Sequence, residues 1–158
     1  MYATWTSILL DLNQLEISSD HLLKFHTILD QATQAIEKKE RKTAMTKISE
    51  LYGLLPLYLE NFSNDQNEIH LYKTKSNILY AYTLMEYNNK EKEIRQYLTN
   101  AKNEFSYLMN ASIDNSLDVT SINKSYVLLN EIEKDFNIKE KKIFYIHYKN
   151  LMQELEVI

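Results

Sequence analysis

Histidines and carboxylates at suitable spacing could bind a metal ion or act in acid–base catalysis. The chain of 158 residues has four His, 22 Asp and Glu together and no Cys. The absence of Cys excludes disulfides, thiol nucleophiles and thiolate metal sites. A di-iron bundle needs Glu-x-x-His pairs, which place two ligands one helical turn apart, and no His in the chain follows a Glu at that spacing. His21 and His26 diverge by roughly 140° around a helix, so they do not converge on one ion. We therefore predict no metal site and no cofactor.

Candidates for nucleophilic or acid–base catalysis are equally sparse. Carboxylates two residues apart, such as Glu91 and Glu93, point to different faces of a helix. No Ser lies in a Gly-flanked elbow with a His placed to activate it. His147 falls on the apolar stripe of the last predicted helix, where we expect a hydrogen-bonded core histidine rather than a metal ligand. We therefore predict no catalytic residue and expect a protein that is not an enzyme.

Tyrosine is the one unusual excess, with 12 Tyr against a single Trp. Many of these side chains fall on the third and fourth predicted helices, on both sides of the only Gly and the only Pro. A tyrosine offers a flat apolar body and a polar tip, which suits a groove for a peptide or a glycan. We therefore nominate a candidate binding groove formed by Tyr52, Gly53, Pro56, Tyr58, Tyr72 and Tyr80. The alternative is that the excess reflects an AT-rich genome and that tyrosines fill the boundary of a helical bundle.

The counts of Gly and Pro, one of each, decide the fold class. Average usage is about 7% Gly and 5% Pro, so turns that need a positive φ or a fixed φ should be almost absent. Sandwiches, barrels and hairpin arrays are excluded on this ground, and so are the Gly-rich phosphate loops of P-loop and Rossmann proteins. The chain is 44% hydrophobic, which is enough to form a core. The fold class that these exclusions leave is all-α.

Charge and hydropathy exclude two further classes of partner. The formal net charge is −4 and no basic face is segregated, so we expect no nucleic-acid partner. The longest apolar run, Leu54 to Leu59, is too short to cross a bilayer. The N-terminus lacks a basic segment followed by an apolar one. Any contact with a membrane would therefore need an anchor outside this sequence.

Apolar residues recur at three- and four-residue steps along almost the whole chain, which predicts six or seven helices around a shared core. The first, second and fourth predicted helices cover about residues 2–16, 19–39 and 65–87. The third carries its stripe from Met45 to Phe62, the fifth begins at Asn88, the sixth follows Ser116 and the last begins after Asn137. The third carries the cleanest apolar stripe, formed by Met45, Ile48, Tyr52, Leu55, Leu59 and Phe62. Pro56 lies within it, so we expect a kink between Tyr52 and Pro56.

Short connections between long helices force neighbours to run antiparallel. The sequence therefore predicts an up-and-down antiparallel helical bundle that forms a single domain over residues 1–158. Three local signals set its internal boundaries: capping boxes at Asn88 and at Asn137, and a polar loop from Asn110 to Ser116. A helical repeat is the alternative architecture, although we find no matching residues between successive helix pairs.

Four stretches carry a family resemblance: Leu51–Ser63, Lys73–Tyr80, Asn123–Glu131 and Ile143–Leu151. They resemble uncharacterised α-helical ectodomains of lipoproteins from low-GC Gram-positive bacteria. The resemblance implies a domain held outside the cell membrane by a lipid anchor, where it binds a protein, a peptide or an envelope component. This chain has neither the leader nor the lipid-acceptor Cys of such proteins. The alternative function is a cytoplasmic helical adaptor for protein–protein interaction. The oligomeric state stays open.

Overall fold

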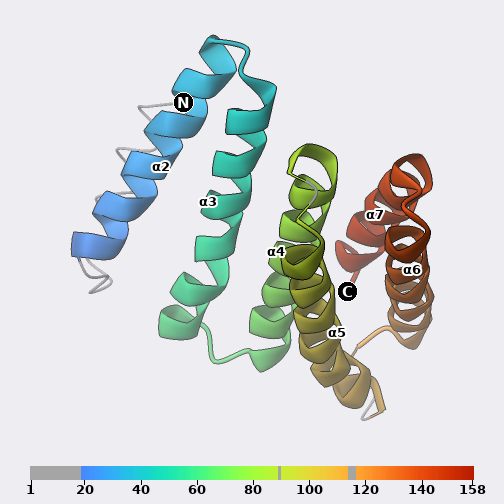
Figure 1. The fold of residues 1–158 in the computed structure, drawn as a ribbon. Coiled ribbons are helices and arrows are strands. Elements are labelled where there is room, and N and C mark those ends of the chain that lie inside the picture. The colour runs from blue at the N-terminus through green and yellow to red at the C-terminus, as the bar shows by residue number, and fades with distance from the viewer. Residues whose placement is uncertain (1–18, 89, 114–116) are drawn as a thin grey trace. The chain divides into compact units, whose positions relative to one another are not determined.

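The computed structural model describes residues 19–88, 90–113 and 117–158, and all regular structure in these ranges is helical (Figure 1). Six helices follow one another: α2 (Ser19–Glu37), α3 (Arg41–Phe62), α4 (Gln66–Tyr87), α5 (Glu91–Ile113), α6 (Val119–Ile138) and α7 (Lys141–Leu155). The prediction of an all-α bundle is confirmed. The first predicted helix, at about residues 2–16, lies outside the described residues.

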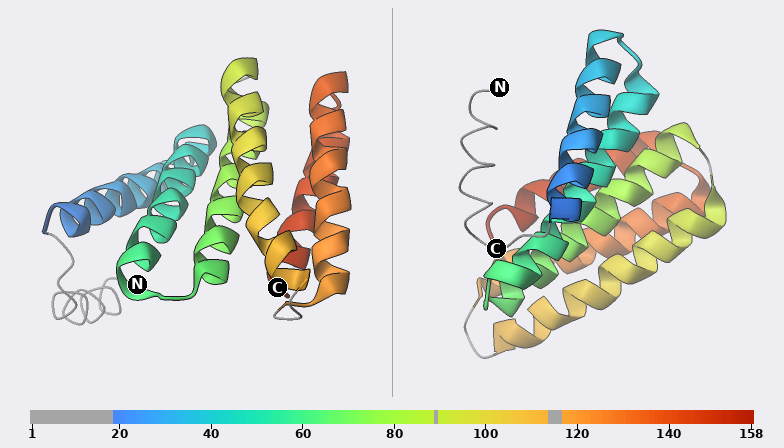
Figure 2. Two further views of the ribbon diagram at one scale, coloured as in Figure 1. Left: turned by 90° about the horizontal axis from the view of Figure 1, so that it is seen from below. Right: turned by 90° about the vertical axis from the view of Figure 1, so that its left-hand side faces the viewer.

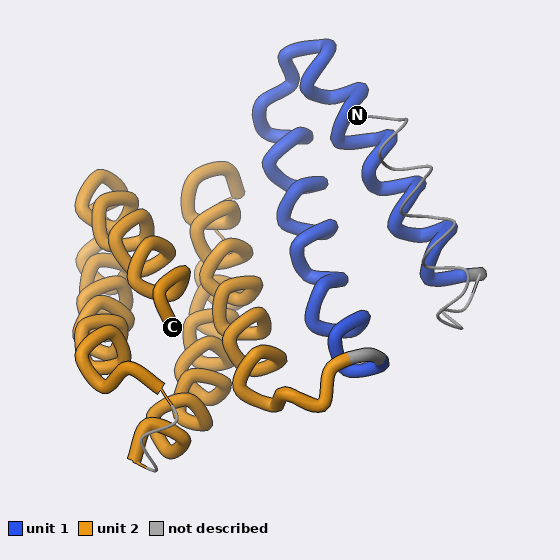
Figure 3. Tube along the Cα trace, turned by 180° about the vertical axis from the view of Figure 1, so that it is seen from behind, with its two compact units in different colours: residues 1–62 blue, residues 63–158 orange. Residues whose placement is uncertain are grey.

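The chain divides into two compact units, residues 1–62 and residues 63–158 (Figure 3). In unit 1, the helices α2 and α3 form an antiparallel hairpin. In unit 2, contacts join α4 to α5, α5 to α6, α6 to α7 and α7 back to α4. These four helices therefore form a closed antiparallel ring, and Figure 2 shows them alongside one another. The single domain over residues 1–158 stays a prediction.

The core of unit 2 contains apolar residues at the three- and four-residue steps from which the helices were predicted. The stripe on α5 is buried throughout: Ile94, Leu98, Ala101, Phe105 and Leu108. On α7, Phe144, Leu151 and Leu155 are fully buried as well. Periodicity identifies core residues correctly here because each of these helices turns one apolar face toward its neighbours.

The stripe predicted for the third helix is only partly correct. Ile48 is exposed, whereas Leu54 and the hydroxyl-bearing Ser49 are buried on α3. The hydroxyl of Ser49 donates to the carbonyl of Met45, four residues back, which lets a small polar side chain occupy a buried position. The buried face is thus rotated relative to the predicted one. The helix is continuous on both sides of Pro56, and the kink stays a prediction.

Three predicted helix boundaries are wrong. Asn88 ends α4 instead of capping α5, and its backbone N–H donates to the carbonyl of Leu84. Asn137 lies inside α6, which continues to Ile138. The predicted loop from Asn110 to Ser116 is helical as far as Ile113, because neither Gly nor Pro interrupts it. Asparagine is common in this chain, so it marks helix ends poorly here.

Two turns contain a residue with a positive φ, and in both of them this residue is a lysine rather than the Gly. Lys39 and Lys139 have φ of 58° and 61°, whereas Gly53 lies inside α3. Each lysine follows the end of a helix and forms the same pair of hydrogen bonds. After α2, Lys39 N donates to Ile36 O and Glu40 N donates to Ala35 O. After α6, Lys139 N and Glu140 N donate in the same way to Phe136 O and Asp135 O. The expectation drawn from the Gly count is therefore wrong for these two turns.

Candidate functional site

The predicted tyrosine groove falls across both units, so each part is described separately. In unit 1, Tyr58 packs its ring against those of His21 and Phe25 at centroid distances of 6.1 and 6.0 Å. Its hydroxyl donates to the carbonyl of His21 at 2.9 Å. Burial raises the pKa of Tyr58. This side chain ties α3 to α2, and its polar tip is engaged within the hairpin.

The remaining unit 1 residues of the predicted groove lie within two turns of one another on α3. Tyr52 and Gly53 are half-buried and Pro56 is buried. In unit 2, Tyr80 stacks on Tyr97 of α5 with centroids 4.9 Å apart. Tyr72 lies beneath the ammonium of Lys75, at 5.3 Å from the ring centroid. A groove that joins all six residues stays a prediction.

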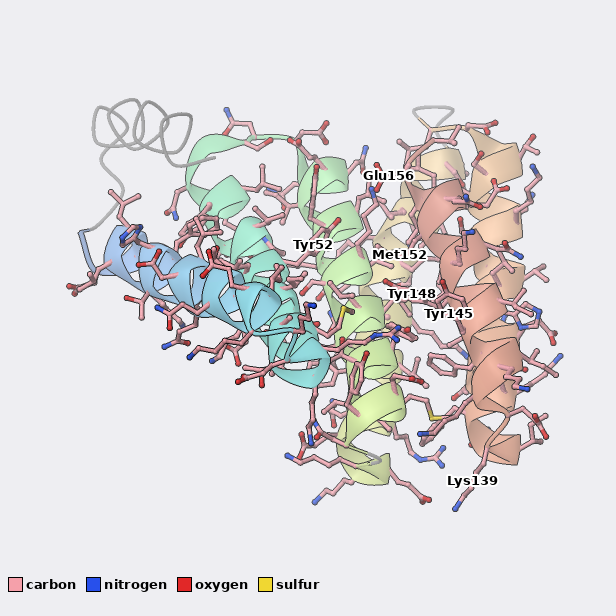
Figure 4. The ribbon with its side chains drawn as sticks, turned by 90° about the horizontal axis from the view of Figure 1, so that it is seen from above. Tyr52, Lys139, Tyr145, Tyr148, Met152 and Glu156 are labelled. Carbon is pink, nitrogen blue, oxygen red and sulfur yellow. The ribbon has the colours of Figure 1, made fainter. Side chains whose placement is uncertain are left out.

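A different tyrosine cluster forms between α4 and α7. Tyr82 and Tyr148 stack with ring centroids 4.3 Å apart, and Tyr145 contacts both rings. Figure 4 shows Tyr145 and Tyr148 on the side of α7 that is turned toward α4. Burial, followed by the neighbouring Tyr82 and Tyr145 hydroxyls, raises the pKa of Tyr148 to about 12. The i,i+3 spacing of Tyr145 and Tyr148 was the available signal, because such residues share one helical face.

The outer surface of the last hairpin carries a groove of about 520 Å³. We call it the α6–α7 groove and define it by its lining: Asn123, Lys124, Val127, Leu128, Asn150, Gln153 and Glu154. Its lining surface is mainly apolar, and Val127 is 57% exposed. The ammonium of Lys124 and a carboxylate oxygen of Glu154 lie 3.5 Å apart across it. The two helices therefore present aliphatic surface bordered by amides and by one ion pair.

The exposed apolar surface continues beyond the groove along α7. Ile146 precedes Asn150 by four residues and Ile143 precedes Ile146 by three, so all three share one helical face. Ile143 and Ile146 are 42% and 53% exposed. Sequence reasoning missed this surface because a helical stripe of aliphatic residues predicts burial.

His147 lies beside this surface and is hydrogen-bonded, as predicted. Its Nδ1 lies 2.6 Å from Oδ2 of Asp135, a buried carboxylate on α6. The imidazole also acts on Glu131, whose pKa is lowered chiefly by a hydrogen bond from Lys134 and to a lesser degree by His147. Within the described part of the chain, no hydroxyl group hydrogen-bonds to His147. The pair links α6 to α7 and resembles only the orienting half of a catalytic triad.

A second cavity, of about 400 Å³, lies at the start of α4. We call it the Lys75 pocket and define it by its lining: Asp65, Asn67, Glu68, Leu71, Tyr72, Lys75, Leu117, Glu156 and Ile158. Lys75 donates to Oε1 of Glu156 at 3.0 Å. The pocket thus brings one predicted site residue, Tyr72, together with a buried cation that no sequence signal had singled out.

The described ranges contain neither a metal-binding cluster nor a membrane-spanning helix. No three His, Asp or Glu side chains there converge as a metal site. None of the six helices is long and apolar enough to cross a membrane.

Comparison of the chain with models of protein families, with curated proteins and with solved structures found no match.

Proposed function

We propose that this chain is a non-enzymatic helical module that binds a protein or peptide in the α6–α7 groove. The exposed aliphatic surface of Val127, Ile143 and Ile146 is the observation that carries the proposal. Contiguous exposed apolar surface beside a groove is typical of interaction sites, because a partner removes it from water. Fully burying one aliphatic side chain contributes about 1.5 to 3 kcal/mol.

The polar border of the groove favours a particular kind of partner. Asn123, Asn150 and Gln153 offer amide donors and acceptors around Val127 and Leu128. The charges of Lys124 and Glu154 compensate each other across the groove. The partner is therefore a segment that places an aliphatic or aromatic side chain on Val127 and offers backbone groups to the amides.

The contacts of His147 support a binding role over catalysis. Asp135 orients its imidazole, but a nucleophile or a metal would be needed to complete a hydrolytic site. The side chain instead fixes the spacing of the two helices that form the groove.

Peptide selection tests the proposal directly. A displayed library of random peptides is selected on the parent protein, and the selected peptides are measured on the variants Val127→Lys and Ile113→Lys. Ile113 is 76% exposed on α5 and lies outside the groove, so its variant is the matched control. We expect Val127→Lys to weaken binding by at least about tenfold, because a charged side chain replaces the apolar contact. Ile113→Lys should leave binding unchanged. Peptides that bind both variants equally well would contradict the proposal.

We further propose that the module acts outside the cell membrane, as the resemblance to lipoprotein ectodomains suggests, with a cytoplasmic adaptor as the alternative. Protease treatment of intact cells that carry a tagged copy of the gene tests the location. Digestion before lysis supports the external site, whereas digestion only after lysis supports the adaptor.

A further inference from the structure

The Lys75 pocket is separate from the α6–α7 groove and contains the buried ammonium of Lys75. The side chain of Lys75 is only 4% exposed, whereas that of its ion-pair partner Glu156 is 68% exposed. A buried ammonium needs compensation, because removing it from water is costly. Here the compensating carboxylate comes from the residue that follows the end of α7, where most of the side chain lies in water. The cation of this pair is therefore buried, and its anion is the solvent-exposed partner.

The ammonium of Lys75 has more N–H donors than its hydrogen bond to Glu156 uses. An ammonium has three N–H donors. Among the described residues, only Glu156 accepts from Lys75, and the other close contact is with the face of the Tyr72 ring at 5.3 Å. A second acceptor can thus approach the ammonium from the cavity.

The remaining carboxylates of the pocket are already engaged. Asp65 caps α4 and accepts from the backbone N–H groups of Asn67 and Glu68. Glu68 in turn accepts from the hydroxyl of Ser63 at 2.9 Å. Their negative charges oppose a phosphate, which carries more than one charge near neutral pH. Exchange of the Glu156 carboxylate for one monocarboxylate instead leaves the charge at Lys75 unchanged.

The other lining residues suit the rest of such a ligand. Leu71, Leu117 and Ile158 supply aliphatic surface, and the ring of Tyr72 lies beside the ammonium. We propose that the Lys75 pocket binds a monocarboxylate with a short apolar portion, whose carboxylate takes the place of Glu156 on Lys75. A small organic acid and the carboxylate of a peptide are two sources of the same chemistry.

Titration with butyrate, followed by amide chemical shifts of the full chain, tests this site. Glu156→Gln removes the internal competitor, so we expect butyrate to bind about tenfold more tightly than to the parent protein. Glu133→Gln makes the same change of charge on α6, where Glu133 pairs with Lys102 outside both sites, and should leave the affinity for butyrate unchanged. Lys75→Met keeps the apolar stem without the ammonium and should abolish binding. Lys102→Met is its control.

Two comparisons complete the experiment. A short peptide with a free C-terminal carboxylate is titrated beside its amidated form. If only the free form binds, and binds more tightly than butyrate, a peptide is the source of the carboxylate. The proposal is overturned if Glu156→Gln binds butyrate no more tightly than the parent protein. If Lys75→Met does not fold, the comparison of butyrate affinity between Glu156→Gln and the parent protein still tests the proposal.

Discussion

The pKa of Tyr148 is strongly raised, and its environment predicts a loss of stability at high pH. Its pKa is raised from 10.0 to about 12 in the folded protein. Below pH 10 both states keep the proton, so this group makes no pH-dependent contribution. Between about pH 10 and 12 the unfolded chain loses its proton first, and the free energy of unfolding falls as pH rises. Tyr148→Phe should therefore reduce this fall when unfolding by urea is measured across that range.

Tyr126→Phe is the matched control, because it removes the hydroxyl of an exposed tyrosine on α6. If both variants lose stability with pH as steeply as the parent protein, the stacked environment of Tyr148 does not disfavour its charged form.

Ser125 has a buried hydroxyl whose oxygen lacks a hydrogen-bond partner within the described structure. Removing such a group relieves the cost of its desolvation, so Ser125→Ala should raise the free energy of unfolding by about 1 kcal/mol. Chemical denaturation measures the change. Ser121 is also buried on α6, but it hydrogen-bonds to Asp118, so Ser121→Ala should be destabilising. Equal effects of the two substitutions would contradict this explanation.

Core residues were largely predictable from the sequence, whereas the residues of the candidate sites were not. Phe105 and Leu151 could be assigned to the core because burial follows helical period. The buried position of Lys75 could not be predicted, because it depends on where the C-terminal end of α7 meets α4. The tyrosine stack has the same cause, since Tyr82 and Tyr148 are distant in sequence.

At the scale of elements, α6 and α7 begin in different ways. Asp118 accepts from the backbone N–H groups of Thr120 and Ser121, whereas Glu140 makes no capping bond with its side chain. Asp118→Ala should therefore lower the midpoint of thermal unfolding, and Glu140→Ala should leave it almost unchanged.

The effect of the Asp118 cap should also depend on pH. The pKa of Asp118 is lowered, first by the Ser121 side chain and then by backbone N–H groups. A depressed pKa contributes stability above the unfolded-state value, and this contribution disappears as pH falls through the folded-state value. The difference between parent and Asp118→Ala should therefore vanish in acid. A difference that persists there would point to another cause.

The positive-φ turns after α2 and α6 predict two stabilising substitutions of unequal size. A left-handed backbone costs a residue other than Gly roughly 1 to 2 kcal/mol. Lys39→Gly should thus raise the free energy of unfolding by about 1 kcal/mol. Lys139→Gly should gain less, because the Lys139 side chain also pairs with Glu91 at 2.6 Å. Lys38→Gly, next to the strained position, is the control and should gain nothing in thermal denaturation. An equal gain at Lys38 would contradict the argument from φ.

The six helices of the described ranges and their order could be predicted from the sequence, but their ends could not. A helix of twenty residues contains several apolar turns, and errors at one position do not hide its period. An end depends on one or two residues, and here lysine occupies the position usually taken by glycine. The shared Lys-Glu pair at 39–40 and 139–140 is the matching element between hairpins that sequence comparison had missed.

At the scale of the whole molecule, unit 2 has a core of its own. Within residues 19–88, 90–113 and 117–158, the largest fully buried side chains, apart from Ser49, all belong to α4, α5, α6 and α7. We therefore expect residues 63–158 to fold when produced alone and to unfold cooperatively on heating, as followed by circular dichroism. Phe105→Ala in this fragment should cost about 3 to 5 kcal/mol. Gradual unfolding of the fragment, insensitive to Phe105→Ala, would show that its core depends on the rest of the chain.

The closed ring of unit 2 also has a consequence for the rate at which it folds. Most of its helix contacts join elements that are consecutive in the chain, and the contact between α4 and α7 is the exception. Local contacts form quickly, whereas a distant pair must first overcome the entropy of closing the intervening loop. The hairpins α4–α5 and α6–α7 are therefore expected to form early, and docking of α7 on α4 to complete the transition. The stacking of Tyr82 on Tyr148 would then report the last step of folding, because it forms only when the ring closes.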